Sequence, residues 1–163
     1  MREEVLERGW DAARGTFVQV YGEPQLDASV LIIPNVGFLR RDDPRVRSTL
    51  AAVRHELASP CEDLIYRYRA PDGLDGHEGA FVACSFWVVQ NLALIGDFAE
   101  AERLFKNLLR RANPLGLLAE EIDPTSGEQL GNFPQGLSHA ALLDTAFILE
   151  KLRPAESSQG SSA

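Results

Sequence analysis

Residues 78–95 read EGAFVACSFWVVQNLALI, the most apolar stretch of this chain. Its apolar side chains are spread almost all the way around a helical wheel, which is typical of a buried helix rather than a surface one. Gly96 follows directly and predicts the end of that helix. Cys84 lies within the stretch and is expected to behave as a small buried hydrophobic residue. The stretch therefore predicts a helix that is buried on all sides.

Helical spacing also dominates on the N-terminal side of this stretch. Apolar positions predict a first helix over residues 2–14, and residues 16–21 (TFVQVY) alternate in a way that favours a short strand or an extended link. Residues 26–33 fit a short buried helix, which Asp27 begins and Pro34 ends. A strand is the alternative there, because the segment is rich in β-branched side chains.

Three further helices are expected. Asp43 followed by Pro44 is typical of a helix start, and Pro60 stops that helix. Apolar spacing predicts helices over residues 97–112 and 135–152 as well. The predicted fold is therefore all-α, with about six helices joined by loops of very different length, and we expect the long loops to gather on one rim.

The composition is that of an ordinary globular domain. The chain has 163 residues, of which 45% are hydrophobic and 25% are charged, so it is long enough for one domain with a real core. Its 24 acidic side chains outnumber its 16 basic ones and give a formal net charge of -8. Such an acidic field repels nucleic acid and anionic membranes but not a neutral sugar. We therefore expect neither nucleic acid nor a membrane as a partner.

No feature of the sequence predicts export. The N-terminus, MREEVLERGWDAARG, is acidic and amphipathic, unlike a signal peptide. The longest apolar runs, residues 30–33 and 86–89, are far shorter than the ~20 residues that span a bilayer. Cys61 and Cys84 have neither metal-ligand nor disulfide-framework spacing. These features predict a cytoplasmic protein, and the polar tail over residues 154–163 is expected to be disordered.

Tyr66-Arg67-Tyr68 places one arginine between two aromatic rings. An arginine fork can donate hydrogen bonds to sugar hydroxyls while neighbouring rings face the apolar side of a sugar. An ordinary surface arginine with packed tyrosines is the alternative, and it is the more common situation for these residue types. From the residues alone, both interpretations stay open.

Residues 72–81 (DGLDGHEGAF) contain three glycines that permit a tight loop leading into the buried helix, with His77 and Glu78 where the helix begins. The alternative role for Glu78 is to complement the positive N-terminal end of that helix. His77 and the scattered carboxylates lack metal-ligand spacing, and the glycines lack the strand and lysine of a phosphate loop. The sequence therefore predicts no metal and no cofactor.

Residues 117–135 (LLAEEIDPTSGEQLGNFPQ) form a long connection, and such loops in compact domains are usually functional. Glycoside hydrolysis uses two carboxyl groups, one protonated and one ionised. Glu120 and Glu121 are adjacent and point in different directions, so they could supply one member of that pair but not both. An acidic surface loop is the alternative. Ser138 and His139 are adjacent on a helix, so their side chains diverge and do not form a catalytic pair.

Taken together, these stretches resemble the C-terminal half of the family-fifteen glycoside hydrolases, the glucoamylases and their bacterial trehalase and glucodextranase-like relatives. The resemblance runs from residue 2 to residue 153, and the common order and spacing of several short motifs carry it. These motifs are Tyr66-Arg-Tyr68, Asp72-Gly-Leu74, Glu78-Gly-Ala-Phe81, Cys84-Ser-Phe-Trp87, Gly116-Leu-Leu-Ala-Glu-Glu-Ile-Asp-Pro124, Gly127, Leu130-Gly-Asn-Phe-Pro-Gln135 and Ser138-His139.

The resemblance implies an (α/α)6 barrel whose pocket lies at a rim of long loops. Residues 1–153 would then form a partial barrel of about six helices, half of a full α/α toroid. The family inverts the anomeric centre: one glutamic acid protonates the glycosidic oxygen, and a second, ionised glutamate takes a proton from the attacking water. The implied substrate is an α-glucan or another α-glucoside oligosaccharide.

The resemblance also implies roles for single residues. Glu120 aligns with the family's general base, and Arg67 aligns with an arginine that holds hydroxyls of the sugar in the cleaved subsite. Three weaker substrate-binding candidates are Tyr68, Glu78 and Glu121. Trp87 is expected to pack instead.

One departure from the family is large. In the family the general acid lies far upstream in a Gly-Ile-Trp-Glu-like stretch, and neither Trp10 nor Trp87 of this chain precedes a glutamate. The family's N-terminal β-sandwich is missing too. Asp72, Asp75 or Glu78 could replace the acid only at about 6.5–9.5 Å from the base. We therefore expect little or no glycosidase activity from this chain alone.

Two functions stay open from the sequence. The first is a segment of a hydrolase that works with an upstream half-domain. The second is a non-catalytic half-barrel that acts as an oligomerising scaffold or as a weak carbohydrate-binding module. A half-barrel exposes a helix face that is normally covered, so self-association is expected under both.

Overall fold

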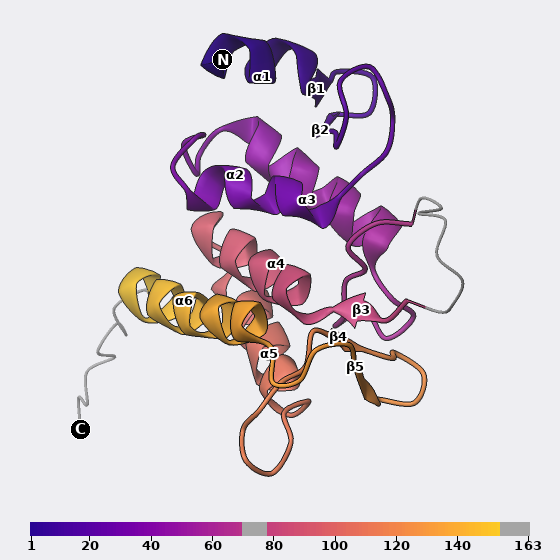
Figure 1. Ribbon diagram of the computed structural model, residues 1–163. Helices are drawn as coiled ribbons and strands as arrows, with labels where there is room; N and C mark the ends of the chain where they lie inside the picture. The colour runs from indigo at the N-terminus through magenta and orange to yellow at the C-terminus, as the bar shows by residue number, and fades with distance from the viewer. Residues whose placement is uncertain (70–77, 154–163) are drawn as a thin grey trace, which may run out of the picture.

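The computed structural model describes residues 1–69 and 78–153 of the chain, and Figure 1 shows how their helices surround one central helix. This central helix, α4 (Val82–Leu94), has every residue buried except Trp87 and Leu94. The prediction of a buried helix is confirmed, and Cys84 is fully buried as expected. This burial raises the pKa of the Cys84 thiol. The helix begins four residues later than predicted, because residues 80–81 pair as a strand.

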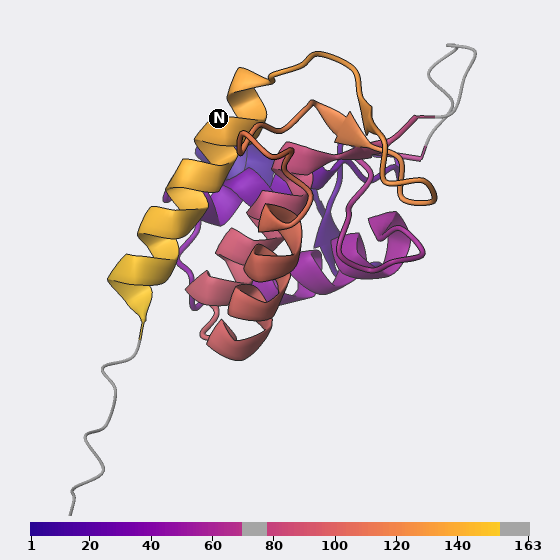
Figure 2. The same cartoon turned by 90° about the horizontal axis from the view of Figure 1, so that it is seen from below.

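Apart from the N-terminal helix, the other helices pack on two sides of α4. On one side lie the short 3-10 helix η1 (Ala28–Leu31), α2 (Ile32–Asn35) and α3 (Pro44–Leu57). On the other side, α5 (Phe98–Leu109) and α6 (Gly136–Leu152) both pack against α4 (Figures 1 and 2). The core is thus built from the two layers that meet on α4. Within the described residues, no helix is long and apolar enough to cross a bilayer.

Two helix starts follow the predicted capping signals. The Asp43 side chain accepts a hydrogen bond from the backbone N–H of Arg45 at 3.0 Å, with Pro44 as the first residue of α3. Asp27 caps η1 in the same way, so the helical interpretation of residues 26–33 is confirmed. Pro34 does not end that segment as predicted. It lies within the first turn of α2, where a helix does not need the missing N–H.

The N-terminal helix is shorter than predicted. α1 covers Arg2–Arg8 and is followed by a small hairpin of β1 (Trp10–Asp11) and β2 (Thr16–Phe17). Trp10 was expected on the helix, but its ring packs edge-on against Phe17 with 5.1 Å between ring centroids. Here the β1–β2 pairing and its cross-strand aromatic contact override the helical spacing of the sequence.

A second small sheet lies beside the start of α4. Strand β3 (Ala80–Phe81) pairs antiparallel with β4 (Glu121–Ile122), which pairs antiparallel with β5 (Gln129–Leu130). The fold is predominantly helical, as predicted, and this small sheet of two-residue strands is a feature that the prediction lacks. The long connection over residues 117–135 contains regular structure, because its middle forms the β4–β5 hairpin. The tail predicted for residues 154–163 lies outside the described residues.

A buried polar contact joins α4 to α6. The Gln90 side chain donates hydrogen bonds to the carbonyl of Ala141 at 3.2 Å and to the hydroxyl of Thr145 at 3.0 Å. Both Gln90 and Thr145 are buried, so leaving either unpaired would be costly. The contact fixes how α6 lies on the central helix and hence where its first turn reaches the sheet.

Candidate functional site

The second sheet, made of β3, β4 and β5, brings distant segments of the chain together beside the start of α4. This part of the molecule is called the rim below. Phe81 lies opposite Glu121 in the β3–β4 pair, and Glu121 lies opposite Leu130 in the β4–β5 pair. On the other side of β3, the Phe81 N–H donates to the carbonyl of Ile65 at 2.8 Å. The stretch that carries Arg67 and the acidic stretch at Glu120 therefore flank the same strand. The stretches over residues 66–68 and 117–135, which the sequence singles out, therefore meet at this strand. β3 itself is the end of the glycine-rich stretch over residues 72–81.

Glu120 directly precedes β4 and is held from two sides. Its carbonyl accepts a hydrogen bond from the Val82 N–H at 3.0 Å, and its own N–H donates to the carbonyl of Asn132 at 3.0 Å. Its carboxylate oxygen Oε2 accepts from the Asn132 backbone N–H at 3.2 Å and from the side-chain Nδ2 at 2.8 Å. The side chain is half-buried. Glu120 is thus a carboxylate in a fixed position at the rim, partly open to solvent.

Gly131 explains how the β5 end comes so close to Glu120. A Cβ at this position would lie 3.1 Å from the Glu120 Cβ and 3.0 Å from its Oε2, and the backbone φ of Gly131 is +73°. Both the space and the left-handed conformation favour glycine. The Leu130-Gly-Asn segment can therefore lie directly against the carboxylate.

Glu121 points to a different partner, as expected for adjacent residues. Its Oε2 accepts a hydrogen bond from the Gly79 N–H at 2.9 Å. The pKa of the Glu121 carboxyl is raised overall, mainly because the side chain is partly buried. The nearby charge of Glu120 raises this pKa further, whereas the hydrogen bond from the Gly79 N–H lowers it. The structure thus directs this carboxylate at the backbone before β3. Its predicted role in binding substrate stays a prediction.

Arg67 is oriented by a buried carboxylate. Its Nε lies 3.2 Å from Oδ2 of Asp27, whose side chain is only 3% exposed, whereas the Arg67 side chain is 51% exposed. The Arg67 guanidinium also lies 5.7 Å from the ring centroid of Tyr68. The Arg67 side chain is thus held at one end by a buried carboxylate while half of its surface remains exposed to solvent. An ordinary surface arginine does not pair with a buried aspartate, so the Arg67–Asp27 pair favours a more specific role for Arg67.

The remaining predicted residues fall in different places. Glu78 is exposed just before β3, Tyr68 is half-buried, and Trp87 packs against the core as expected. Asp72 and Asp75, the weaker candidates for a replacement acid, lie outside the described residues. Among the residues that the structure describes, no group of three or more His, Cys, Asp or Glu side chains is arranged to hold a metal.

Sequence reasoning missed two partners at the rim. The sequence identifies Asp27 only as a helix cap, because its pairing with Arg67 joins positions 40 residues apart. Asn132 was part of a matching motif, Leu130-Gly-Asn-Phe-Pro-Gln135, which was the available signal, but nothing local assigns its amide to Glu120.

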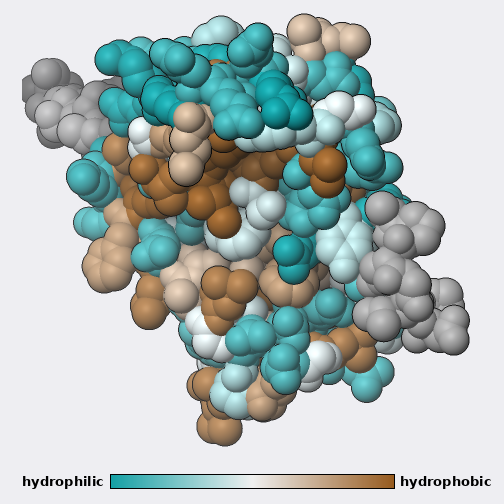
Figure 3. Space-filling view, turned by 45° about the horizontal axis from the view of Figure 1, so that its top comes forward, coloured by the Kyte–Doolittle hydropathy of each residue, from teal (hydrophilic) through white to brown (hydrophobic). Residues whose placement is uncertain are grey.

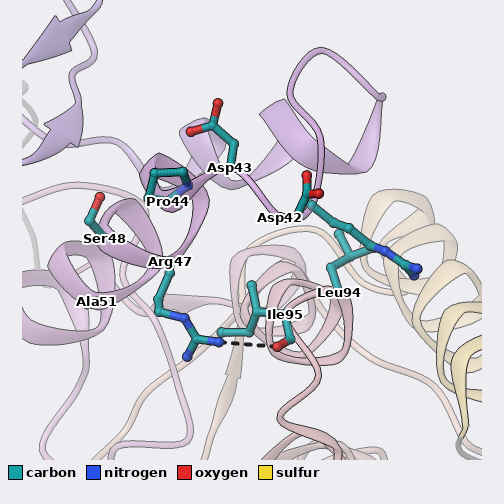
Figure 4. Close-up of a pocket in the computed structure, with 9 residues that line it drawn as sticks. Asp42, Asp43, Pro44, Arg47, Ser48, Ala51, Leu94 and Ile95 are labelled. Atoms are coloured by element: carbon teal, nitrogen blue, oxygen red, sulfur yellow. Dashed lines mark hydrogen bonds between the residues drawn. The ribbon is translucent and has the colours of Figure 1, made fainter.

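A separate pocket of about 590 Å³ lies at the other end of α4. It is lined by the start of α3 and the end of α4, and Arg47 reaches across to donate to the carbonyl of Ile95 at 3.3 Å (Figure 4). Glu120 contacts Val82 at the first turn of α4, so about 20 Å of helix separates the two places. This pocket is therefore not part of the rim.

Comparison with known proteins places this arrangement in a family. The model of the family described as "Glycosyl hydrolases family 15" matches residues 1–147. The chain belongs to glycosyl hydrolase family 15. The family resemblance expected from the motifs is thereby confirmed.

Family 15 relatives of similar sequence include trehalases. The trehalase of Mycobacterium tuberculosis is 45% identical over 164 residues, which cover 99% of this chain and 23% of that protein. The trehalase of Thermoplasma volcanium is 41% identical over 151 residues, covering 93% of this chain and 24% of that protein. This family 15 chain therefore spans about a quarter of the length of the trehalases it matches.

Solved structures agree with the family 15 assignment. A wild-type glycosidase superposes with a TM-score of 0.75 at 26% identity, covering 94% of this chain and 43% of that one. A glycosidase variant solved in complex with glucose gives a TM-score of 0.75 at 25% identity. The chain is accordingly similar to a part of a helical glycosidase.

Proposed function

We propose that residues 1–153 are the C-terminal half of an (α/α)6 catalytic domain of an inverting α-glucoside hydrolase, similar to glucoamylases and trehalases. Glu120 is its general base. The observation that carries this proposal is the position of the Glu120 carboxylate, which Asn132 and the β3–β4 pairing hold beside β3, the same strand that binds Ile65 in the stretch leading to Arg67. The helices packed around α4 supply about half of such a barrel.

In the proposed reaction Glu120 is ionised and takes a proton from a water molecule as the oxygen of that water attacks the anomeric carbon. An acid on the opposite side of the sugar protonates the leaving oxygen. Arg67, which Asp27 orients, donates hydrogen bonds to sugar hydroxyls. Tyr68, Glu78 and Glu121 contact the substrate near it. The substrate is an α-glucan or α-glucoside oligosaccharide, and trehalose is the first one to test, because close relatives are trehalases.

The acid is proposed to come from an upstream half-domain, since this chain covers only 23% of the length of the M. tuberculosis trehalase. A positioned general acid contributes about 10²–10⁴-fold to the rate, and the wall that carries it also closes the pocket. The purified chain is therefore expected to release no glucose from trehalose or maltose above the buffer rate. A coupled glucose assay measures this, with the M. tuberculosis trehalase at equal molarity as the positive control. Glucose release at a rate similar to that control would disprove the missing-acid proposal.

A second candidate function, an oligomerising scaffold or weak carbohydrate-binding module, is favoured by the outer face of α6. Leu143 is 56% exposed and Phe147 is 71% exposed on this face, one helical turn apart. Exposed hydrophobic surface is also gathered in a hollow on the face that Figure 3 shows, rather than scattered singly. Apolar surface of this kind drives association.

This candidate predicts that the chain self-associates through α6. In sedimentation experiments at high concentration, Phe147→Ser is expected to shift the population strongly toward monomer, because it removes the most exposed apolar side chain of α6. Val36→Ser is the matched control: Val36 is 69% exposed but lies at the end of α2. A wild-type chain that is monomeric at every concentration, or an equal effect of both variants, would contradict association through α6.

A further inference from the structure

We infer that Ser138 and His139, on the first turn of α6, hold Glu120 in position by binding the backbone of the two residues before it. The inference rests on the proposed role of Glu120 as general base. The two residues act through another residue, so they are positioning residues and not catalytic ones.

The backbone of Leu118 and Ala119 is the segment that they hold. Both residues are fully buried, so each of their backbone polar groups needs a partner. The Leu118 N–H donates to Nε2 of His139 at 3.4 Å, and the Leu118 carbonyl accepts from the Gln135 N–H at 2.9 Å. The Ala119 carbonyl accepts from the Ser138 hydroxyl at 2.8 Å. Three of these four backbone groups are therefore satisfied by the start of α6.

The fourth group is satisfied from the hairpin. The Ala119 N–H donates to Oε1 of Gln129, the first residue of β5, at 2.7 Å. The Gln129 amide in turn donates to the carbonyl of Arg111 at 3.1 Å. Leu118 and Ala119 are thus held between α6 and β5, an arrangement called the clamp below. Glu120 is the next residue after the clamp.

The contacts of His139 define one protonation state. Nε2 accepts a hydrogen bond, so it carries no proton. Nδ1 lies 2.8 Å from the Gln135 carbonyl, which can only accept, so Nδ1 carries the proton. A ring with the proton on Nε2 would turn a donor toward the Leu118 N–H. Only the neutral ring with Nδ1–H fits both neighbours. His139 therefore accepts a specific hydrogen bond from the Leu118 backbone, which a side chain that only fills space would not do.

The adjacency of Ser138 and His139 serves this arrangement. Side chains of neighbouring helical residues diverge, which excludes a catalytic pair but lets the two bind backbone groups of two successive residues, Leu118 and Ala119. Ser138 is fully buried and reaches Ala119, while His139 is half-buried and reaches Leu118. Because α6 is itself fixed on α4 through Gln90 and Thr145, the clamp ties Glu120 to the central helix.

Nuclear magnetic resonance of the whole chain tests the inference without substrate or activity. At about pH 8, where an ordinary imidazole is neutral, the 15N shifts of His139 are expected to show the Nδ1–H form. His139→Ala is expected to speed hydrogen exchange of the Leu118 N–H by about tenfold, the loss of one hydrogen bond. It is also expected to shift the side-chain amide signals of Asn132, which report the position of the Glu120 carboxylate.

His139→Gln is the second variant, because its side-chain oxygen can take the place of Nε2 and restore both signals. His55→Gln, on the exposed face of α3, is the matched control and should change neither. A proton on Nε2 in the wild-type chain, or a His139→Gln variant as perturbed as His139→Ala, would overturn the inference in favour of simple packing. If His139→Ala does not fold, the wild-type ring signals and His139→Gln still decide. None of these readouts depends on Glu120 being a base, so the two proposals can fail separately.

Discussion

Replacing Phe86 with alanine is expected to lower the free energy of unfolding by about 3–5 kcal/mol, the typical loss for a fully buried phenylalanine. Phe86 is 0% exposed in the middle of α4, and its ring packs edge-on against Phe105 of α5 with 6.1 Å between centroids. The change removes buried apolar surface and leaves a cavity where the two helix layers meet. Domains of this size are stable by only about 5–15 kcal/mol, so much of the total stability would be lost.

Urea unfolding followed by circular dichroism measures this loss. Phe147→Ala, measured at low protein concentration, is the control: the same side chain is removed from a site that is 71% exposed, so the change should stay within about 0.5 kcal/mol. Similar losses for both variants would mean that α4 is not the centre of the core.

Placing this chain in a complete trehalase should reveal its proposed base. We expect a chimera in which residues 1–153 replace the matching part of the M. tuberculosis enzyme to release glucose from trehalose, since the two are 45% identical. In that chimera Glu120→Gln is expected to slow glucose release by about 10²–10⁴-fold. Glutamine keeps an oxygen for Asn132 but cannot take a proton from water.

Glu128→Gln is the matched control for the chimera, because Glu128 is exposed in the turn between β4 and β5 and should leave the rate unchanged. A Glu120→Gln chimera that keeps the parent rate would remove Glu120 from the mechanism. A parent chimera that is folded but inactive would show that this chain does not supply a working base.

Much of the helical fold could be predicted because its signals are local. The apolar stretch at α4 and the Asp43-Pro44 start of α3 each identify a helix from neighbouring residues. The errors have a common cause. The hairpin at Trp10 and the sheet at Glu121 consist of two-residue strands, which have no periodicity of their own, and Glu121 pairs with Phe81 from a distant part of the chain.

The candidate site divides in the same way. The motifs by themselves identified the family and nominated Glu120 and Arg67 as residues of interest. Only the tertiary structure brought Asp27 to Arg67, Asn132 to the Glu120 carboxylate, and Ser138 and His139 to the backbone before it. These contacts join residues 12 to 40 positions apart, and hydrogen-bond partners at such separations are chosen by how the helices pack around α4. The sequence determined which groups are present, and the packing of the folded chain decided which of them meet.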